Sequence, residues 1–389
     1  MADNGRRNEA DAPFPLQGGR LIRRFLPLVE RLHLAGTERD RAGNRQLFFD
    51  QYLSLLLLYF FTPSIKSLRA LQAATNWEKT RQKLGIRRTS LGSLSEATRV
   101  FDASLVVPII AELAAQALPL KQGREAEALK GLTAVDGSVF SALPRMAWAL
   151  WEDKTHRGAK LHLHFDVLKG VPCAATLTPA ACSEPAELAR TLQAGRLYVL
   201  DRGYASYELF AQIVQAGSSL VARVKNTTVF VAQEERPLDA AAQKAGVVRD
   251  VVISRLGTAH HKDHLRRPMR LVIVQVIDRD GQASELWLIT DRLDLDADLV
   301  ALAYRYRWTV ELFFRWMKSV LGARHLVSQK QNGVTLQMYA ALIVSLLIIL
   351  NTGRKPTVRT YETLQFYLLD WVTDAELDQH LASLQKILG

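Results

Sequence analysis

The pattern of apolar and polar positions predicts a helical region at the start of the chain. From Arg20 to about Leu120, apolar residues recur at helical spacing, as in LFFDQYLSLLLLYFF. This run breaks at Thr62-Pro63-Ser64, where Ser64 is expected to cap the next helix. The preceding residues, 1–19, are polar with Gly and Pro and predict a flexible arm. We therefore expect an all-α N-terminal domain over residues 20–127.

After Leu129 the pattern changes to short apolar runs that favour strands. Strands are predicted at residues 132–140, 160–168, 171–178, 196–201 and 218–225. Gly170 marks a hairpin turn, and a helix is expected from Ser206 to Ala216. Residues 226–290 alternate with period two, which predicts a β-rich insertion. Helix resumes at Asp296 and continues through Lys318. The pattern predicts a mixed α/β domain over 128–330 and a helical C-terminal segment over 331–389 packed on the core.

Composition narrows the class of protein. A chain of 389 residues with 48% hydrophobic content can bury a large core. Its two cysteines, Cys173 and Cys182, lack the paired spacing of a zinc site and form no disulfide framework, so a reducing cytoplasm is expected. The first residues lack an apolar signal core. The most apolar runs, Tyr52 to Phe61 and Met338 to Leu350, are shorter than the roughly 20 residues of a membrane span. We interpret both as buried helices and expect no membrane partner.

Charge favours a polyanionic partner. The 50 Lys and Arg residues exceed the 39 Asp and Glu residues, which leaves a formal charge of +11. Nucleic acid is the first candidate, and an ordinary solvated cationic surface is the alternative. Between Ser64 and Arg99 lie eight cations and two acids, a cluster that suits phosphate contacts or forms an exposed face.

Two aspartates end apolar strands. Asp136 lies in VDGS and Asp201 in LDRGY. An acid at a strand end, next to or near Gly, can project from the sheet edge into a cleft, although such an Asp is also common as a turn residue or helix cap.

A single carboxylate, Glu311, lies in the cationic helix YRYRWTVELFFRWMK. At about 100° per residue this helix is amphipathic, and its polar stripe surrounds Glu311 with groups able to bind phosphate. The stripe consists of Tyr304, Arg307, Glu311, Arg315 and Lys318. The simpler alternative for Glu311 is a surface ion pair.

These residues carry a family resemblance. The chain resembles the DDE transposases of bacterial insertion sequences, in the IS-four group with a Tyr-x2-Arg-x3-Glu-x6-Lys signature. Tyr304, Arg307, Glu311 and Lys318 match that spacing. The resemblance extends over about residues 130–330, including DGS at 136–138, LHLHFDVLKGVPCAATLT and LDRGYASYELF. It implies a ribonuclease H-like catalytic core with a β-rich insertion between the second Asp and the Glu, and so an α/β fold class.

The resemblance also implies the roles of the acids. Asp136, Asp201 and Glu311 would be the catalytic residues and would ligate two Mg²⁺ (or Mn²⁺) ions, hard cations that prefer carboxylate oxygen. The histidines at 260, 261 and 264 are interpreted as a loop feature rather than a metal site.

The cations and one aromatic ring would bind DNA. In the family, the signature Tyr, Arg and Lys contact phosphate near the cut, and this role passes to Tyr304, Arg307 and Lys318. Arg315 lies on the same stripe. Arg202 would assist, or would pair with a nearby acid. Trp287, in SELWLIT, would stack on a flipped base, the alternative being a core position.

The expected function is that of an insertion-sequence transposase. It would cut and join DNA by metal-dependent hydrolysis and transesterification, by a cut-and-paste route through a hairpin intermediate. Its partners would be double-stranded DNA at terminal inverted repeats, target DNA and a second copy in a homodimer, in the bacterial cytoplasm at the nucleoid. Two alternatives stay open: a catalytically silent, transposase-derived DNA-binding repressor, and a structure-specific ribonuclease H-like nuclease.

Overall fold

The structure is a computed structural model of the whole chain. It describes residues 25–36, 44–62, 64–120, 122–142, 146–149, 157–257, 267–277, 280–323, 325–353, 357–369 and 371–385. The expected N-terminal arm and the histidines at 260, 261 and 264 lie outside these residues. Two compact units are present, one made of residues 1–105 and 347–389 and the other of residues 106–346. This division differs from the expected boundaries, because it falls inside one long helix and groups the last helices with the first.

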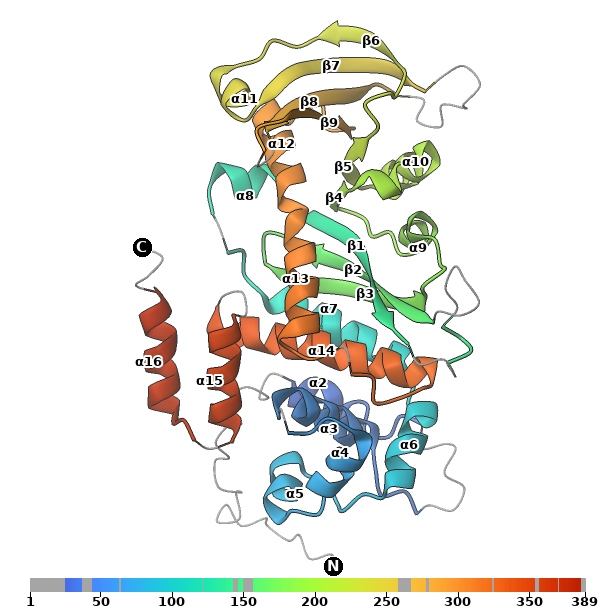
Figure 1. The fold of residues 1–389 in the computed structure, drawn as a ribbon, viewed down its shortest axis with the longest axis vertical. Coiled ribbons are helices and arrows are strands. Elements are labelled where there is room, and N and C mark those ends of the chain that lie inside the picture. Colours follow the sequence, from blue (N-terminus) through green and yellow to red (C-terminus); the bar gives the residue numbers. More distant parts are fainter. Residues whose placement is uncertain are drawn as a thin grey trace, which may run out of the picture. The chain divides into compact units, whose positions relative to one another are not determined.

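A single mixed sheet of nine strands forms the second unit (Figure 1). Its strands in chain order are β1 (Leu132–Ser141), β2 (Gly158–Asp166), β3 (Val171–Pro179), β4 (Leu197–Leu200), β5 (Ser219–Val224), β6 (Phe230–Glu235), β7 (Val247–Leu256), β8 (Met269–Ile277) and β9 (Ala283–Thr290). Across the sheet their order is β3-β2-β1-β4-β5-β9-β8-β7-β6. The α/β fold class and the predicted strands of the first half are confirmed.

The hairpin between β2 and β3 follows directly from the sequence. Gly170 has φ 69°, in the left-handed region that favours glycine, and its N–H donates to the carbonyl of Asp166 at 2.8 Å. This turn sets an antiparallel register in which Leu161 lies opposite Leu177. β2 in turn pairs antiparallel with β1, whereas β4 and β5 run parallel to β1.

The predicted β-rich insertion continues the main sheet. β9 pairs antiparallel with β5, and β8, β7 and β6 follow outward as a meander. The segment is therefore β-rich as expected, but its backbone hydrogen bonds extend the core sheet. Periodicity reports which residues alternate faces and not which strand lies beside which.

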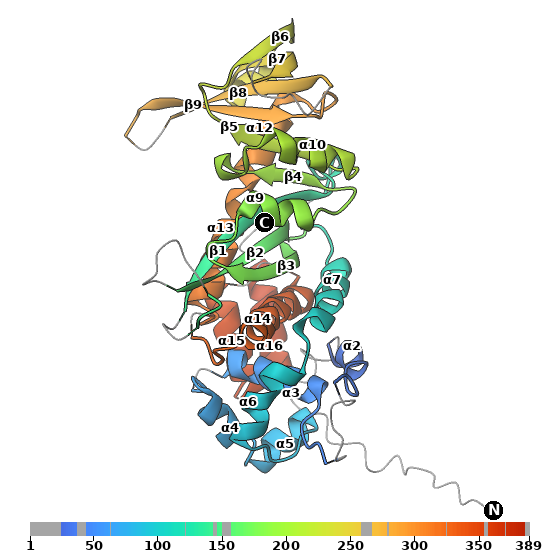
Figure 2. The same cartoon turned by 90° about the vertical axis from the view of Figure 1, so that its right-hand side faces the viewer.

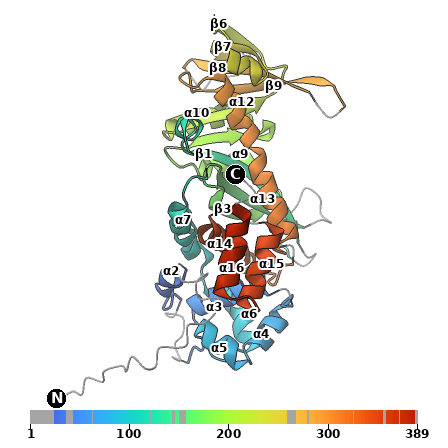
Figure 3. The same ribbon diagram turned by 90° about the vertical axis from the view of Figure 1, so that its left-hand side faces the viewer.

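Helices cover the two faces of this sheet. α9 (Glu184–Arg190) and α10 (Tyr207–Gln215) lie on one face, and α12 (Ala297–Tyr306) and α13 (Trp308–Ser319) on the other, as the two side views show (Figures 2 and 3). Beneath α10 a cluster of buried apolar side chains joins both halves of the sheet. It includes Val135, Tyr198, Phe210, Ile253, Leu271 and Ile289. The unit also contains α7 (Val107–Gln116), α8 (Arg124–Ala128) and α11 (Ala240–Lys244).

The helix predicted from Asp296 to Lys318 is divided in two. α12 ends at Tyr306, and α13 begins at Trp308, although Arg307 keeps right-handed helical angles of φ −52° and ψ −36°. Val310, Phe313 and Met317 are buried, and Phe313 lies 5.1 Å from the Phe165 ring of β2. The expected apolar side of the helix thus faces the sheet.

The first unit is helical, as predicted. Its helices are α2 (Leu26–Glu30), α3 (Phe49–Phe61), α4 (Leu68–Ala74), α5 (Glu78–Leu84), α6 (Leu91–Val100), α15 (Val358–Leu368) and α16 (Asp374–Gln385). Tyr361 of α15 donates a hydrogen bond to the carbonyl of Phe60 in α3. This bond joins the N-terminal and C-terminal segments of the first unit. The break at Thr62 is confirmed. The prediction that Ser64 caps the next helix is wrong. Ser67 is the N-cap of α4, and its hydroxyl accepts a hydrogen bond from the N–H of Ala70.

α14 (Gln331–Thr352) is longer than the apolar run suggested. Of the described residues it is the one helix long and apolar enough to cross a membrane, and 89% of its most apolar window is buried. The apolar run Met338 to Leu350 is itself shorter than a span, but the helix that contains it extends further at both ends. Its burial agrees with the predicted core helix.

We expect the buried ion pair between β7 and β8 to dominate the stability of the extended sheet. Arg270 is 1% exposed, and two of its nitrogens donate to the Asp250 carboxylate at 2.7 and 2.6 Å. Asp250→Asn leaves a buried guanidinium without its counter-charge and should lower the free energy of unfolding by about 3–5 kcal/mol. Urea denaturation measures this loss.

The exposed ion pair of Arg249 and Glu235 in the same sheet provides a matched control. Glu235→Gln should cost about 0–1 kcal/mol, because water and salt screen that pair. Equal losses for Asp250→Asn and Glu235→Gln would contradict the stabilising role of the buried pair.

Candidate active site

The parallel pairing of β1 with β4 sets Asp136 and Asp201 side by side. Ala134 lies opposite Val199, and two residues further along each strand the chain reaches Asp136 and Asp201. Both acids are half-buried. Since Asp136 pairs with Leu163 and Ala134 with Phe165, whose ring contacts Phe313, the Asp136 side chain belongs to the sheet face covered by α13.

Local backbone contacts orient both carboxylates. The Asp136 carboxylate accepts a hydrogen bond from the N–H of Gly137 at 2.8 Å. Asp201 caps the short 3₁₀-helix Arg202–Tyr204 and accepts from the N–H of Gly203 at 2.7 Å. Asp201 therefore does act as a cap, the alternative left open for strand-end acids, and this role leaves its second oxygen available.

Glu311 lies on α13, the helix over this face of the sheet, and its charge is paired. Its carboxylate lies 2.5 Å from Arg307, and the two side chains are 28% and 16% exposed. The Arg307 guanidinium also lies over the Tyr304 ring, 5.9 Å from its centre. Burial would lower the pKa of Arg307, but the hydrogen bond to Glu311 and the charges of Tyr304, Glu311 and Asp201 raise it. Arg307 thus links the helix electrostatically to Asp201.

The Asp136 carboxyl is costly to ionise. Burial raises its pKa to about 7, and the charges of Glu184 and Asp201 act in the same direction, whereas the Gly137 hydrogen bond and Arg307 oppose them. Asp136 lies within β1 and not at its end as expected, because pairing with β2 continues the strand to Ser141. Such a pKa shift is typical of a functional site.

The donor set suits a hard divalent cation, but the three predicted acids do not form a ready ligand cluster. Asp136 and Asp201 offer carboxylate oxygens whose mutual repulsion a cation would relieve. Among the described residues no three Asp, Glu, His or Cys side chains gather closely enough to hold a metal ion. Glu311 is held by Arg307, so it would have to exchange that partner for a metal.

The other predicted site residues differ in their contacts and exposure. Lys318 donates to the carbonyl of Val139 at 2.7 Å and lies 4.8 Å from the centre of the Phe140 ring, so it reaches the strand that carries Asp136. Arg202 and Arg315 are exposed. Trp287 is half-buried against the core cluster, and its indole donates to Glu285 at 2.9 Å.

Glu184 is an acid near the site that the sequence did not reveal. It begins α9, a helix absent from our prediction, and pairs with Lys160 at 3.2 Å. Ser183 followed by Glu184 and Pro185 is a helix-start signal that could have located α9. No sequence pattern indicates that this helix begins beside Gly137.

The fold and the site together define a mixed α/β protein whose sheet carries one acid within β1 and a second directly after the neighbouring parallel strand β4. The family model described as transposase DDE domain matches residues 127–347, more than half of the chain. The chain belongs to this family, and the resemblance inferred from the sequence is confirmed.

Two curated relatives agree with this assignment. The chain is 29% identical over 194 residues to the putative transposase y4zB of Sinorhizobium fredii, over 49% of this chain and 53% of the relative. It is 25% identical over 220 residues to the probable transposase for insertion sequence element IS5377 of Geobacillus stearothermophilus, over 56% of each. The chain spans about half the length of the curated relatives it matches.

One solved structure is also similar. The piggyBac transposase in a synaptic complex with hairpin DNA aligns with 94% of this chain and 82% of its own, with a TM-score of 0.41 and 10% identity.

The pKa of Asp136 predicts a pH-dependent stability in the absence of metal. The unfolded chain ionises this group near pH 4, whereas the folded protein ionises it near 7. The protonated Asp136 carboxyl contributes to the free energy of unfolding at low pH. This contribution is lost as the pH rises through 7, because the folded state must then ionise a buried carboxyl. Asp136→Asn removes this penalty.

We therefore expect Asp136→Asn to be more stable than the unaltered protein at pH 8, by at most about 4 kcal/mol, and to lose this advantage toward pH 4. Urea denaturation in EDTA at several pH values measures the difference. A difference that does not change with pH would contradict the shifted pKa.

Proposed function

We propose that this chain is the transposase of an insertion sequence and that it cuts and joins DNA at the element ends. The observation that carries this proposal is that Asp136 and Asp201 lie level with each other in neighbouring parallel segments. Arg307, the ion-pair partner of Glu311, acts electrostatically on both. Membership of the transposase DDE domain family and the names of the relatives support this activity.

The order of strands supports a ribonuclease H-like catalytic core. In the half of the sheet ordered β3-β2-β1-β4-β5, β2 alone runs against the others. The β-rich segment between Asp201 and Glu311 corresponds to the insertion that the family resemblance implies. The core would place the three acids on neighbouring elements.

Asp136, Asp201 and Glu311 would hold two Mg²⁺ or Mn²⁺ ions. Bound there, the metal would supply charge stabilisation for the attacking and leaving oxygens of a phosphodiester. The chain's own contribution is to fix Asp136 and Asp201 through the N–H groups of Gly137 and Gly203. Arg307 would keep Glu311 in place until the metal competes for its carboxylate.

The surrounding cations would hold the DNA phosphates. Arg307 and Lys318 lie beside the acids, and Tyr304 supports the Arg307 guanidinium with its ring. Arg202 and Arg315 are exposed and free to extend this contact along the backbone of the DNA. Trp287 would stack on a flipped base only after leaving its contact with Glu285.

The substrates would be terminal inverted repeats and target DNA, bound by a homodimer at the bacterial nucleoid. The helical N-terminal region would add DNA contacts through its cations, among them the exposed Arg87 and Arg88. Cutting would follow a cut-and-paste route through a hairpin intermediate.

A second candidate function is that of a DNA-binding repressor derived from a transposase. The observation that favours it is the close Arg307–Glu311 pair, which occupies the carboxylate that catalysis requires. A repressor would keep the cationic surface and would not depend on the acids.

Neutralising the acids separates these two functions. Asp201→Asn and Glu311→Gln should each reduce cleavage of a plasmid carrying the element ends by about 100-fold or more, beyond the 10–100-fold typical of groups that only support a metal ligand. Retained DNA binding in a gel-shift assay would show that the variants remain folded and bind DNA.

Glu234→Gln is the matched control, because this exposed acid lies on the distant edge strand β6. It should cleave like the unaltered protein. Full cleavage by Asp201→Asn or Glu311→Gln would remove that residue from the catalytic set, and DNA binding without cleavage by the unaltered protein would favour the repressor.

The phosphate role of Lys318 predicts a change in salt dependence. Lys318→Gln should lower the slope of log K against log salt concentration by about 1, because one phosphate contact is lost. Lys244→Gln, at an exposed position in α11, should leave the slope unchanged. Fluorescence anisotropy with labelled DNA measures both slopes, and equal slopes for the two variants would contradict this role.

A further inference from the structure

We propose that Glu184 is a positioning residue of this site, whose negative charge strengthens the binding of divalent cations at Asp136 and Asp201. The inference rests on the proposed function, because it assumes that those two acids hold metal. Glu184 lies outside the Tyr-Arg-Glu-Lys signature and comes from α9, on the sheet face opposite α13.

Gly137 allows the Glu184 carboxylate to approach β1. A Cβ added at Gly137 would lie 2.7 Å from Glu184 Oε1 and 3.0 Å from its Cδ. Gly137 is opposite His162 in the sheet, so its missing side chain belongs to the α9 face, whereas Asp136 belongs to the α13 face. The Glu184 carboxylate therefore occupies the space that a side chain at position 137 would fill. It lies on the α9 face of β1, next to the residue that carries the Asp136 carboxylate.

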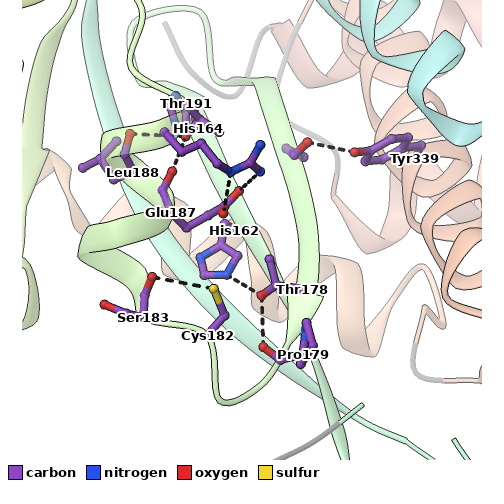
Figure 4. A network of polar contacts seen from close by, with 12 residues as sticks. His162, His164, Thr178, Pro179, Cys182, Ser183, Glu187, Leu188, Thr191 and Tyr339 are labelled. Carbon is purple, nitrogen blue, oxygen red and sulfur yellow. Dashed lines mark hydrogen bonds and ion pairs between the residues drawn. The ribbon is translucent and has the colours of Figure 1, made fainter. Parts of the chain in front are cut away.

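The helix that carries Glu184 takes part in a network of polar contacts that reaches the sheet at His164 (Figure 4). At its C-terminal end the Thr191 hydroxyl lies 3.2 Å from Nε2 of the buried His164. In its middle the buried Glu187 accepts two hydrogen bonds from Arg190, at 3.2 and 2.6 Å. At its start Ser183 caps the helix. The Thr191–His164 contact and the buried Leu188 attach α9 to the sheet, while the other contacts stabilise the helix itself.

Lys160 holds the carboxylate from the other side. Its ammonium lies 3.2 Å from Glu184 and donates to the carbonyl of Cys182 at 3.2 Å, and its side chain is only 14% exposed. Lys160 and Gly137 together fix the Glu184 side chain in one position, and Lys160 balances part of its charge.

Glu184 and the two aspartates act on the same neighbouring group, Tyr204. Burial and then the charges of Glu184, Asp136 and Asp201 raise the pKa of the Tyr204 phenol well above its usual value. Glu184 therefore acts on the same region as the two aspartates. A divalent cation bound at Asp136 and Asp201 would also be attracted by the Glu184 carboxylate, because solvent screens a partly buried charge only weakly.

Manganese binding to the full chain without DNA tests this inference. Glu184→Gln should raise the Mn²⁺ dissociation constant by about 10-fold, as measured by the loss of free Mn²⁺ signal in electron paramagnetic resonance. In a cleavage assay, the Mn²⁺ concentration giving half of the maximal rate should rise by the same factor. The rate at saturating Mn²⁺ should recover to within about 3-fold, because Glu184 does not touch the reacting atoms.

Two further variants separate charge from structure. Lys160→Gln removes the balancing cation and should tighten Mn²⁺ binding, the opposite of Glu184→Gln. Gly137→Ala keeps the charge but displaces the carboxylate, because its Cβ would meet Glu184, and it should weaken binding. Glu208→Gln, the same change at an exposed position of the next helix, should leave binding unaltered.

Several results would overturn the inference. An unchanged Mn²⁺ dissociation constant in Glu184→Gln would do so, as would a cleavage defect that high Mn²⁺ does not recover in a folded variant. If the unaltered protein binds Mn²⁺ but cuts no DNA, the proposed function fails while the binding series still decides the role of Glu184. If it binds no Mn²⁺, both fail.

Discussion

The parallel hydrogen-bonded pairing of β1 with β4 is the constraint on which the site depends. It sets Asp136 and Asp201 level with each other although 64 residues of chain separate them, as their positions in the sequence show. β4 ends at Leu200, one residue before its acid, while β1 continues beside β2. The two carboxylates thus meet where one strand leaves the sheet and the backbone N–H groups that follow are free to orient them.

Near these aspartates, a cation balances a glutamate on each face of the sheet. On one face Arg307 pairs with Glu311 and acts electrostatically on Asp201, and on the other Lys160 pairs with Glu184 beside Gly137. Each acid from a helix therefore comes with its own cation, while Asp136 and Asp201 have only backbone donors. Because Asp136 has no paired cation, burial and the charges of Glu184 and Asp201 raise its pKa, and Arg307 opposes them only in part.

Much of this arrangement could be predicted from local pattern. The strand around Asp136, the strand before Asp201 and the Gly170 hairpin follow from apolar runs and turn residues, and the amphipathic spacing predicted that Val310, Phe313 and Met317 face the core. The Arg307–Glu311 contact follows from helical spacing, because residues four apart are neighbours on a helix. Local pattern could not decide whether Ser64 or Ser67 caps α4, since both serines lie in the loop before the helix.

The sequence by itself determined most of the elements, the family and the acid that follows β4, because these depend on residues that are neighbours along the chain. Only the tertiary structure decided that the β-rich segment extends the main sheet through β5 and β9, and that α9 brings Glu184 against Gly137. It also decided that Glu311 is paired with Arg307 and that no three acids form a metal cluster among the residues described. Strand neighbours and charge partners from distant segments are selected by packing and hydrogen bonding across the whole sheet, which no local pattern records.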